Sequence, residues 1–105
     1  MKLISWNVNG VRSILQKGLD QFIAETDPDI LCLQEIKSRA DQVPPEAFPY
    51  PYAYWHSAQR PGYSGTAIFC KQKPLRVEAD MPLDRTLGEG RVLVAAFADF
   101  FLVTT

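Results

Sequence analysis

Two stretches near the start of the chain decide its fold, KLISWNVNG at residues 2–10 and DILCLQE at residues 29–35. Each is a short apolar run that ends in polar side chains. The first ends in the amides of Asn7 and Asn9, and the second ends in the carboxylate of Glu35. Apolar runs of this length, bounded by turn residues and charges, predict two buried strands.

The segment between these strands has the spacing of an amphipathic helix over residues 12–25. Its apolar side chains fall at positions i, i+4, i+7 and i+8 and form one stripe. Gly18 weakens this helix slightly, and Pro28 ends it, because proline disfavours helix in the residue before it. The stripe consists of Leu15, Leu19, Phe22 and Ile23.

A strand over residues 2–6, this helix and a strand over residues 29–34 form a βαβ unit, whose strands are parallel. Parallel sheets bind their ligands beyond the carboxyl ends of the strands. Asn7 and Glu35 both follow such ends. We therefore expect the two side chains to be neighbours at one edge of a sheet.

The remaining sequence predicts shorter elements and a final hairpin. We expect an α/β fold with one mixed sheet, one βαβ unit and covering helices. The expected elements are a short helix or loop over 38–48, strands over 50–55, 66–70 and 75–79, a loop over 56–65, a polar connection over 80–90, and hairpin strands over 91–97 and 100–104.

Composition and charge are those of an ordinary globular protein. The 105 residues allow one domain at most, and they are 47% hydrophobic and 22% charged. The net charge is −1, so nucleic-acid binding would depend on a local basic patch and not on the total charge. No apolar run approaches membrane-spanning length and no signal-peptide pattern is present, so we expect no membrane partner.

The two cysteines, Cys32 and Cys70, lie in apolar runs that predict strands. Two cysteines do not make a disulfide framework, and no Cys/His metal spacing is present. Buried free thiols are the simplest interpretation. A reducing compartment suits such thiols, so we expect a cytoplasmic protein.

Glu35 and Asn7 are the candidate ligands for a divalent metal. A carboxylate is a hard oxygen donor for Mg²⁺ or Mn²⁺, and an amide can order a metal-bound water or a phosphate oxygen. Each also has an ordinary interpretation, an acid that caps a helical turn for Glu35 and a turn residue for Asn7. Their joint position at parallel strand ends favours a site.

Basic and aromatic residues near these positions are candidates for contact with phosphate. Arg12 and Lys37 each follow a candidate ligand by a few residues and suit phosphate oxygens. Arg60 and Tyr63 lie in a loop with Gly62, where a tyrosine can pack on a sugar or base while the arginine meets a phosphate. Solvated surface charges and a plain turn are the alternatives. We interpret His56, the single histidine, as structural.

Four segments, in this order along the chain, resemble a known family. They are SWNVNGVR (5–12), PDILCLQEIK (28–37), GYSGTAI (62–68) and EGRV (89–92). Together they resemble the N-terminal part of the exonuclease III-type apurinic/apyrimidinic endonucleases, within the wider endonuclease/exonuclease/phosphatase superfamily. The resemblance covers essentially the whole chain, and the third and fourth segments are the more particular to this branch.

The resemblance implies a four-layer α/β sandwich, of which this chain would form the N-terminal half. It implies Mg²⁺-dependent hydrolysis of double-stranded DNA at abasic sites and 3′ ends. In such enzymes the residue that matches Glu35 binds the metal, and the residue that matches Asn7 arranges the metal and phosphate site. The positions of Arg12 and Tyr63 contact the DNA backbone. The position of Asn9 is often aspartate in relatives, so a charge on the metal from that position is missing here.

Other catalytic residues of the resembled family have no match before residue 105. These are an Asp-x-Asn motif, a tyrosine and a terminal Asp-His pair. We therefore assign no catalytic residue, and we expect the isolated chain to be inactive.

We also expect one sheet with an uncovered apolar inner face, and hence self-association. The alternatives are a non-catalytic DNA-binding or interaction module and a phosphatase of the same superfamily, against which the GYSG loop argues.

Overall fold

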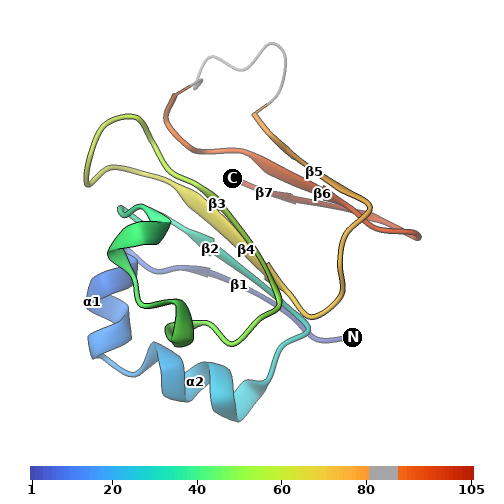
Figure 1. The fold of residues 1–105 in the computed structure, drawn as a ribbon, viewed down its shortest axis with the longest axis horizontal. Coiled ribbons are helices and arrows are strands. Elements are labelled where there is room, and N and C mark those ends of the chain that lie inside the picture. The colour runs from blue at the N-terminus through green and yellow to red at the C-terminus, as the bar shows by residue number, and fades with distance from the viewer. Residues whose placement is uncertain (81–87) are drawn as a thin grey trace.

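Two sheets and a helical layer form the fold of residues 1–80 and 88–105, the part of the chain that this computed structural model describes (Figure 1). The first sheet is mixed and has the strand order β1-β2-β4-β3. Its strands β1 and β2 are parallel, and the other two pairs are antiparallel. The bounds are β1 Leu3–Asn7, β2 Ile30–Gln34, β3 Tyr52–His56 and β4 Thr66–Cys70.

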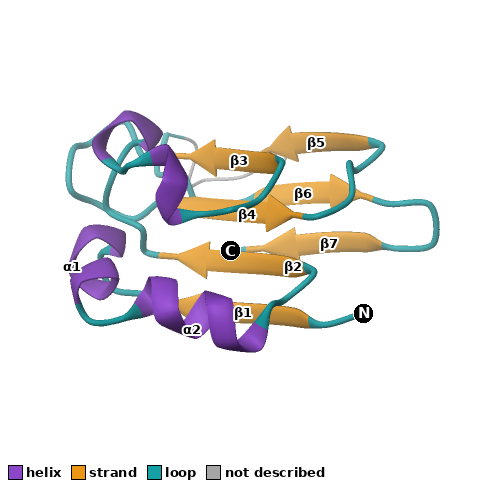
Figure 2. Cartoon of the chain, turned by 60° about the horizontal axis from the view of Figure 1, so that its bottom comes forward, coloured by secondary structure: helices purple, strands orange, loops and turns teal. Residues whose placement is uncertain are grey.

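The second sheet consists of β5 and the C-terminal hairpin, in the order β5-β6-β7 (Figure 2). All of its pairs are antiparallel. The predicted hairpin and the predicted strand before it are confirmed, whereas residues 81–87 of the predicted polar connection lie outside the described residues. The bounds are β5 Arg76–Ala79, β6 Leu93–Ala96 and β7 Phe101–Thr104.

The predicted βαβ unit is confirmed, but the prediction of one continuous helix is wrong. The segment forms α1 (Val11–Gln16) and α2 (Leu19–Thr26). Gly18 separates them in a left-handed conformation, with φ +105°. Glycine reaches this region without the steric cost that other residues have, so the chain turns here and α2 continues in a new direction. Within the predicted segment 38–48, the structure has two 3₁₀ turns, η1 Ala40–Gln42 and η2 Pro45–Ala47.

One hydrophobic core lies between the helices and the first sheet. Apolar side chains of β2 and β4 meet the buried face of α2. A cluster of aromatic side chains, Phe48, Trp55 and Phe69, completes this core. Phe48 stacks on Phe69 with ring centroids 4.3 Å apart, and Trp55 meets Phe69 edge to face at 5.6 Å. The principal members are Val11, Leu19, Ile23, Leu31, Leu33 and Phe69.

The strand β1 is less buried than the sequence predicts. It lies at the edge of the first sheet, and its residues alternate between exposed and half-buried. Ile4 and Trp6 pack on the helical core, whereas Leu3 and Ser5 point to the other face and are exposed. Successive side chains of a strand point to opposite faces of the sheet, so an edge strand that one layer covers cannot be buried on both sides.

A second core fills the space between the two sheets, and it corrects the expectation of one sheet with an uncovered inner face. Side chains of β2 and β4 pack against Leu93 and Ala95 of β6. Strands β2 and β4 are apolar on both faces, so each face needs a covering layer. The hairpin and β5 provide it for this face. The first sheet contributes Ile30, Cys32, Ile68 and Cys70.

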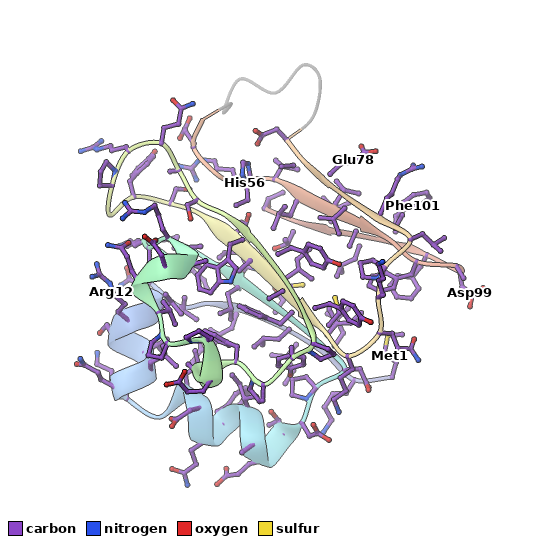
Figure 3. The ribbon with its side chains drawn as sticks, in the orientation of Figure 1. Met1, Arg12, His56, Glu78, Asp99 and Phe101 are labelled. Atoms are coloured by element: carbon purple, nitrogen blue, oxygen red, sulfur yellow. The ribbon has the colours of Figure 1, made fainter. Side chains whose placement is uncertain are left out.

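Among the described residues, two of the large hydrophobic side chains that are exposed lie next to each other on the outer face of β7. Leu102 faces the core between the sheets, and its two neighbours on the strand, Phe101 and Val103, are 68% and 56% exposed. Figure 3 shows Phe101 and Glu78 on the side of the second sheet that is away from the helices. Within the described residues, no helix is long and apolar enough to cross a membrane.

Candidate functional site

The side chains of Asn7 and Glu35 are in contact at the carboxyl edge of the parallel pair. Asn7 is the last residue of β1 and lies opposite Gln34, the last residue of β2. The Nδ2 group of Asn7 donates a hydrogen bond to the carboxylate of Glu35. The prediction that these two residues are neighbours is therefore confirmed.

Backbone hydrogen bonds hold the two turns that follow β1 and β2 against each other. The amide of Gly10 donates to the carbonyl of Glu35 at 2.8 Å, and the amide of Val11 donates to that of Ile36 at 2.9 Å. Glu35 and Asn9 both have left-handed backbones, with φ of 53° and 48°. Left-handed residues other than glycine are uncommon and gather at functional sites, where the surrounding structure fixes them. The side chains at this edge are thus positioned by the backbone.

Lys37 is directed into this site. Its Nζ donates to Oδ1 of Asn9 at 2.6 Å, and the backbone amide of Asn9 donates to Oδ1 of Asn7 at 3.1 Å. Asn7, Asn9, Glu35 and Lys37 therefore form one polar cluster. An ammonium group at this position can still approach a phosphate that enters the cluster, so the contact of Lys37 with DNA stays a prediction.

The donors of the cluster fit a divalent metal that a phosphate helps to bind. Carboxylate and amide oxygens are the hard ligands that Mg²⁺ and Mn²⁺ prefer. The part of the chain described here contains no group of three or more His, Cys, Asp or Glu side chains that could hold a metal ion. Mg²⁺ is typically held by one or two carboxylates together with waters and substrate phosphates. Glu35 provides one such carboxylate.

The loop between β3 and β4 is joined to the same cluster. The amide of Lys37 donates to the carbonyl of Ser64 at 2.8 Å, and the amide of Ile36 donates to that of Gly65 at 3.2 Å. Gly65 has φ +93°, and a Cβ at this position would lie 2.6 Å from Cγ1 of Ile36. Glycine therefore permits the close approach. It holds the loop that contains Tyr63, the residue before Ser64, against the turn that follows β2.

Tyr63 is held by charged partners. Its hydroxyl donates to the Glu89 carboxylate at 2.8 Å and accepts from Nη2 of Arg91 at 2.8 Å. The guanidinium groups of Arg60 and Arg91 lie 5.2 and 5.6 Å from its ring centroid, within the range of cation–π attraction. The hydrogen bonds to Glu89 and Tyr63 raise the pKa of Arg91. The predicted grouping of Arg60 with Tyr63 is confirmed.

Sequence reasoning assigned no role to Glu89 and Arg91, although it singled out the segment that contains them. The signal available was an acid and a base two residues apart, on either side of Gly90, where a predicted strand begins. Their contact with Tyr63 depends on how the second sheet packs on the first, which no local pattern gives.

Arg12 lies in the first turn of α1, directly after the turn that ends β1, and its side chain is exposed. Figure 3 shows it near one end of the molecule, with Met1 and Asp99 at the other end. It lines an open groove of 520 Å³ between α1 and η2. The structure thus places Arg12 beside the cluster but gives it no contact with the other candidates. The remaining groove residues are Leu15, Gln16, Asp20, Pro44, Glu46 and Ala47.

His56 takes no part in the cluster. Its Nε2 lies 2.8 Å from Oδ1 of Asp80, and both side chains are 18% exposed. This contact joins the end of β3 in the first sheet to the residue after β5 in the second. A half-buried contact of this kind is consistent with the structural role that we expect for His56.

Comparison with known families identifies the chain. The model of the endonuclease/exonuclease/phosphatase family matches residues 4–105. The chain belongs to this family. The match includes both turns of the polar cluster, the Tyr63 loop and the second sheet. The expected fold class, a mixed α/β sandwich with a βαβ unit and a terminal hairpin, is confirmed by it and by the solved structures that the chain resembles.

Two curated proteins are similar over nearly the whole chain. An exodeoxyribonuclease of Bacillus subtilis is 44% identical over 105 residues, which are 99% of this chain and 41% of that protein. The DNA repair nuclease APEX1 of Danio rerio is 46% identical over 109 residues, which are 99% of this chain and 35% of that protein. The chain therefore matches the N-terminal part of such nucleases and spans about two-fifths of their length or less.

A solved structure gives the same fold. The 3′ phosphatase NExo from Neisseria, bound to a product DNA hairpin, superposes with a TM-score of 0.80 at 28% identity. The superposition covers 98% of this chain and 40% of that one. The resemblance found in the sequence is thus confirmed as family membership.

Proposed function

We propose that this chain is the metal-binding and DNA-binding part of a DNA repair nuclease of the exonuclease III type. Such an enzyme would hydrolyse phosphodiester bonds of double-stranded DNA at abasic sites and 3′ ends, with a divalent metal. The contact between Asn7 and Glu35 at the carboxyl edge of β1 and β2 carries this proposal. The names of the curated relatives and the DNA-bound structure of a similar protein support the choice of substrate.

In this proposal the polar cluster holds the metal. Glu35 would provide the carboxylate ligand, and the amide of Asn7 would orient a water or a phosphate oxygen. Mg²⁺ is the expected ion and Mn²⁺ the alternative. A bound divalent ion polarises a phosphate and stabilises the leaving oxygen. Lys37 donates a hydrogen bond to Asn9 and would keep the side-chain amide of Asn9 in place.

The basic and aromatic side chains around the cluster would position the DNA backbone. Arg12 is exposed in the first turn of α1, and Arg60 and Tyr63 lie in the loop that is bonded to the turn after β2. Arginine binds phosphate with two parallel hydrogen bonds. The overall charge of −1 gives DNA no general attraction, so binding would depend on this local group.

The experiment that tests the proposal is a salt titration of DNA binding. Fluorescence anisotropy would measure the affinity of the chain for a duplex with an abasic site. We expect the logarithm of the affinity to fall linearly with the logarithm of the salt concentration, and Arg12→Ala to reduce the slope by about one phosphate contact. Lys73→Ala removes an exposed charge beyond the far end of β4 and should leave the slope unchanged. Binding that does not respond to salt would contradict the proposal.

We expect no detectable cleavage of the same duplex by the chain alone, with Mg²⁺ present. Hydrolysis needs a group that orients the attacking water in addition to the metal ligand. The described residues place one carboxylate in the cluster and contain no group of three or more His, Cys, Asp or Glu side chains that could hold a metal ion. Rapid metal-dependent cleavage by the purified chain would show that this reasoning is wrong.

We further propose that the protein works in a reducing compartment such as the cytoplasm. Cys32 and Cys70 are free and buried. Free thiols persist where glutathione and thioredoxin keep them reduced. Fractionation of cells that express the tagged protein would test this location, and recovery of the protein from an oxidising compartment would contradict it.

A further inference from the structure

Glu89 is the centre of a contact between the two sheets. One oxygen, Oε1, accepts hydrogen bonds from the Tyr63 hydroxyl at 2.8 Å and from Nε of Arg91 at 2.9 Å. Nη2 of Arg91 donates to the Tyr63 hydroxyl and closes the triangle. The Glu89 side chain is 34% exposed. The carboxylate thus ties a residue of the loop between β3 and β4 to a residue just before β6.

The backbone around Glu89 is fixed against that loop. Gly90 has φ +66°, and a Cβ there would lie 2.5 Å from the carbonyl oxygen of His56. The amide of Gln59 donates to the carbonyl of Gly88 at 2.7 Å, and the hydroxyl of Thr66 donates to that of Gly90 at 3.1 Å. Close backbone packing and hydrogen bonds on both sides of Glu89 therefore fix the position of its carboxylate.

The result is an ordered surface of one aromatic ring and two cations. The guanidinium groups of Arg60 and Arg91 both lie near the Tyr63 ring. Arg91 uses Nε and Nη2 for Glu89 and Tyr63, and a guanidinium has five N–H donors in all, so some remain for a ligand. Groups that are ordered before binding lose less conformational entropy when the ligand arrives.

We propose that Glu89 is a positioning residue for DNA binding, a role that rests on the proposed function. Its carboxylate holds Tyr63 and Arg91 so that the ring and the two guanidinium groups meet the DNA backbone as one preformed unit. Glu89 itself is an acid and repels phosphate, so it acts through the two residues that it holds.

This role and a purely electrostatic role predict opposite results. If Glu89 acted as a charge alone, its removal would strengthen DNA binding, because a negative charge near the phosphates would disappear. If Glu89 positions its partners, Glu89→Ala weakens binding although the net charge becomes less negative. Glu89→Gln keeps an oxygen that accepts the two hydrogen bonds, and it should retain or improve the affinity.

The test is the affinity of the chain for the abasic duplex, measured by anisotropy at several salt concentrations. We expect Glu89→Ala to weaken binding about fivefold, the effect of about one lost hydrogen-bond contribution, and Glu89→Gln to bind at least as well as the unchanged chain. Glu78→Ala is the matched control. It removes the same charge from the outer face of β5, where Glu78 pairs with Arg76, and it should not weaken binding.

The possible outcomes distinguish a failure of the role of Glu89 from a failure of the proposed function. If the unchanged chain shows no salt-dependent binding, the proposed function fails, and the role of Glu89 fails with it. If the unchanged chain binds and Glu89→Ala binds equally or more tightly, the positioning role alone is overturned. Should Glu89→Ala not fold, Glu89→Asp decides: it keeps the charge and shortens the reach, so positioning predicts weaker binding and a charge effect alone predicts no change.

Discussion

Glu35 combines the side chain proposed as the metal ligand with an unfavourable backbone. Its φ of 53° is in the left-handed region, which costs a residue with a Cβ about 1–2 kcal/mol. The conformation persists because the Glu35 carbonyl accepts the amide of Gly10 and the next two amides donate to Gly65 and Ser64. The neighbouring turns thus hold the carboxylate toward Asn7, at a cost that the surrounding hydrogen bonds offset.

Asp29 makes a pH-dependent contribution to stability. Its carboxylate accepts the backbone amide of Lys2 at 2.6 Å, and this hydrogen bond lowers the pKa of Asp29 below its ordinary value of 3.8. A lowered folded-state pKa stabilises the protein above the unfolded value, and the contribution is lost as the pH falls through the folded value. We expect Asp29→Asn to lower the unfolding free energy at neutral pH, and the difference from the unchanged chain to disappear as the pH falls through the folded-state pKa, which lies below 3.8.

Urea unfolding of both proteins at a series of pH values would measure this. A difference in unfolding free energy that is the same at neutral and acid pH would show that the Asp29 charge is not responsible. Asp99, an exposed acid in the hairpin turn, offers the control variant Asp99→Asn, which should follow the unchanged chain.

For single residues, the sequence predicts the contacts that follow from strand order. It does not predict the contacts that form where one sheet packs on the other. Asn7 and Glu35 are 28 residues apart, yet their contact follows from the rule that parallel strands end at one edge. Tyr63 and Glu89 are 26 residues apart, and no such rule connects them. Their contact depends on the angle and register at which the second sheet lies on the first.

At the scale of elements, local patterns predict the βαβ unit and the hairpin but not the layer that the hairpin forms. Loop length and turn residues fix which strands are parallel or paired. The apolar runs of β2 and β4 require cover on both faces but do not say which segment provides it. The helix break at Gly18 has a similar cause, because the sequence shows that glycine weakens a helix but not where the chain must turn.

Gly90 lets the segment before β6 approach the loop after β3, and a matched pair of variants can measure this contact. Gly90 and Gly62 have nearly the same φ, +66° and +67°, but a Cβ meets backbone atoms at 2.5–2.8 Å at Gly90 and nothing within 4 Å at Gly62. We expect Gly62→Ala to cost about 1 kcal/mol of unfolding free energy, for the left-handed backbone. Gly90→Ala should cost about 2 kcal/mol more, because the backbone must also move.

Chemical denaturation of the two variants would measure both costs. Equal losses of unfolding free energy in Gly62→Ala and Gly90→Ala would mean that the close approach at Gly90 does not contribute to stability. A larger loss of unfolding free energy in Gly90→Ala, together with weaker binding to the abasic duplex, would show that the close approach at Gly90 supports the surface formed by Tyr63, Arg60 and Arg91.

The packing of the second sheet on the first can be measured through the two thiols. Cys32 and Cys70 lie in the core between the sheets, and burial raises the pKa of Cys32 to about 12 and that of Cys70 to about 11. The thiolate is the reactive form, so both cysteines should be inert toward a thiol reagent at neutral pH. We expect both to react once urea unfolds the chain. Rapid reaction of either thiol under native conditions would show that the second sheet does not cover this face.

At the scale of the whole molecule, the outer face of β7 is the surface on which copies of the chain would associate. Phe101 and Val103 are exposed there on a strand that lies at the edge of its sheet, and exposed apolar edges favour pairing with another chain. We expect sedimentation velocity to show concentration-dependent self-association, which the double substitution Phe101→Ser and Val103→Thr should reduce.

Leu75 provides the control for this prediction. It is exposed just before β5, at the opposite edge of the same sheet, so Leu75→Ser removes a similar apolar side chain from another place. Association that weakens equally in Leu75→Ser would point to a general apolar effect and not to the face of β7.

The central claim concerns the whole molecule, because it requires the βαβ unit, both turns and the loop between β3 and β4 to bring one cluster together at one edge. The most direct measurement is the broadening of backbone amide NMR signals by Mn²⁺. We predict that broadening begins at residues 7–10 and 35–37, that Mg²⁺ reverses it, and that Glu35→Gln abolishes it while Glu46→Gln, an exposed acid in η2, does not. Broadening that starts elsewhere, or that persists in Glu35→Gln, would contradict the account.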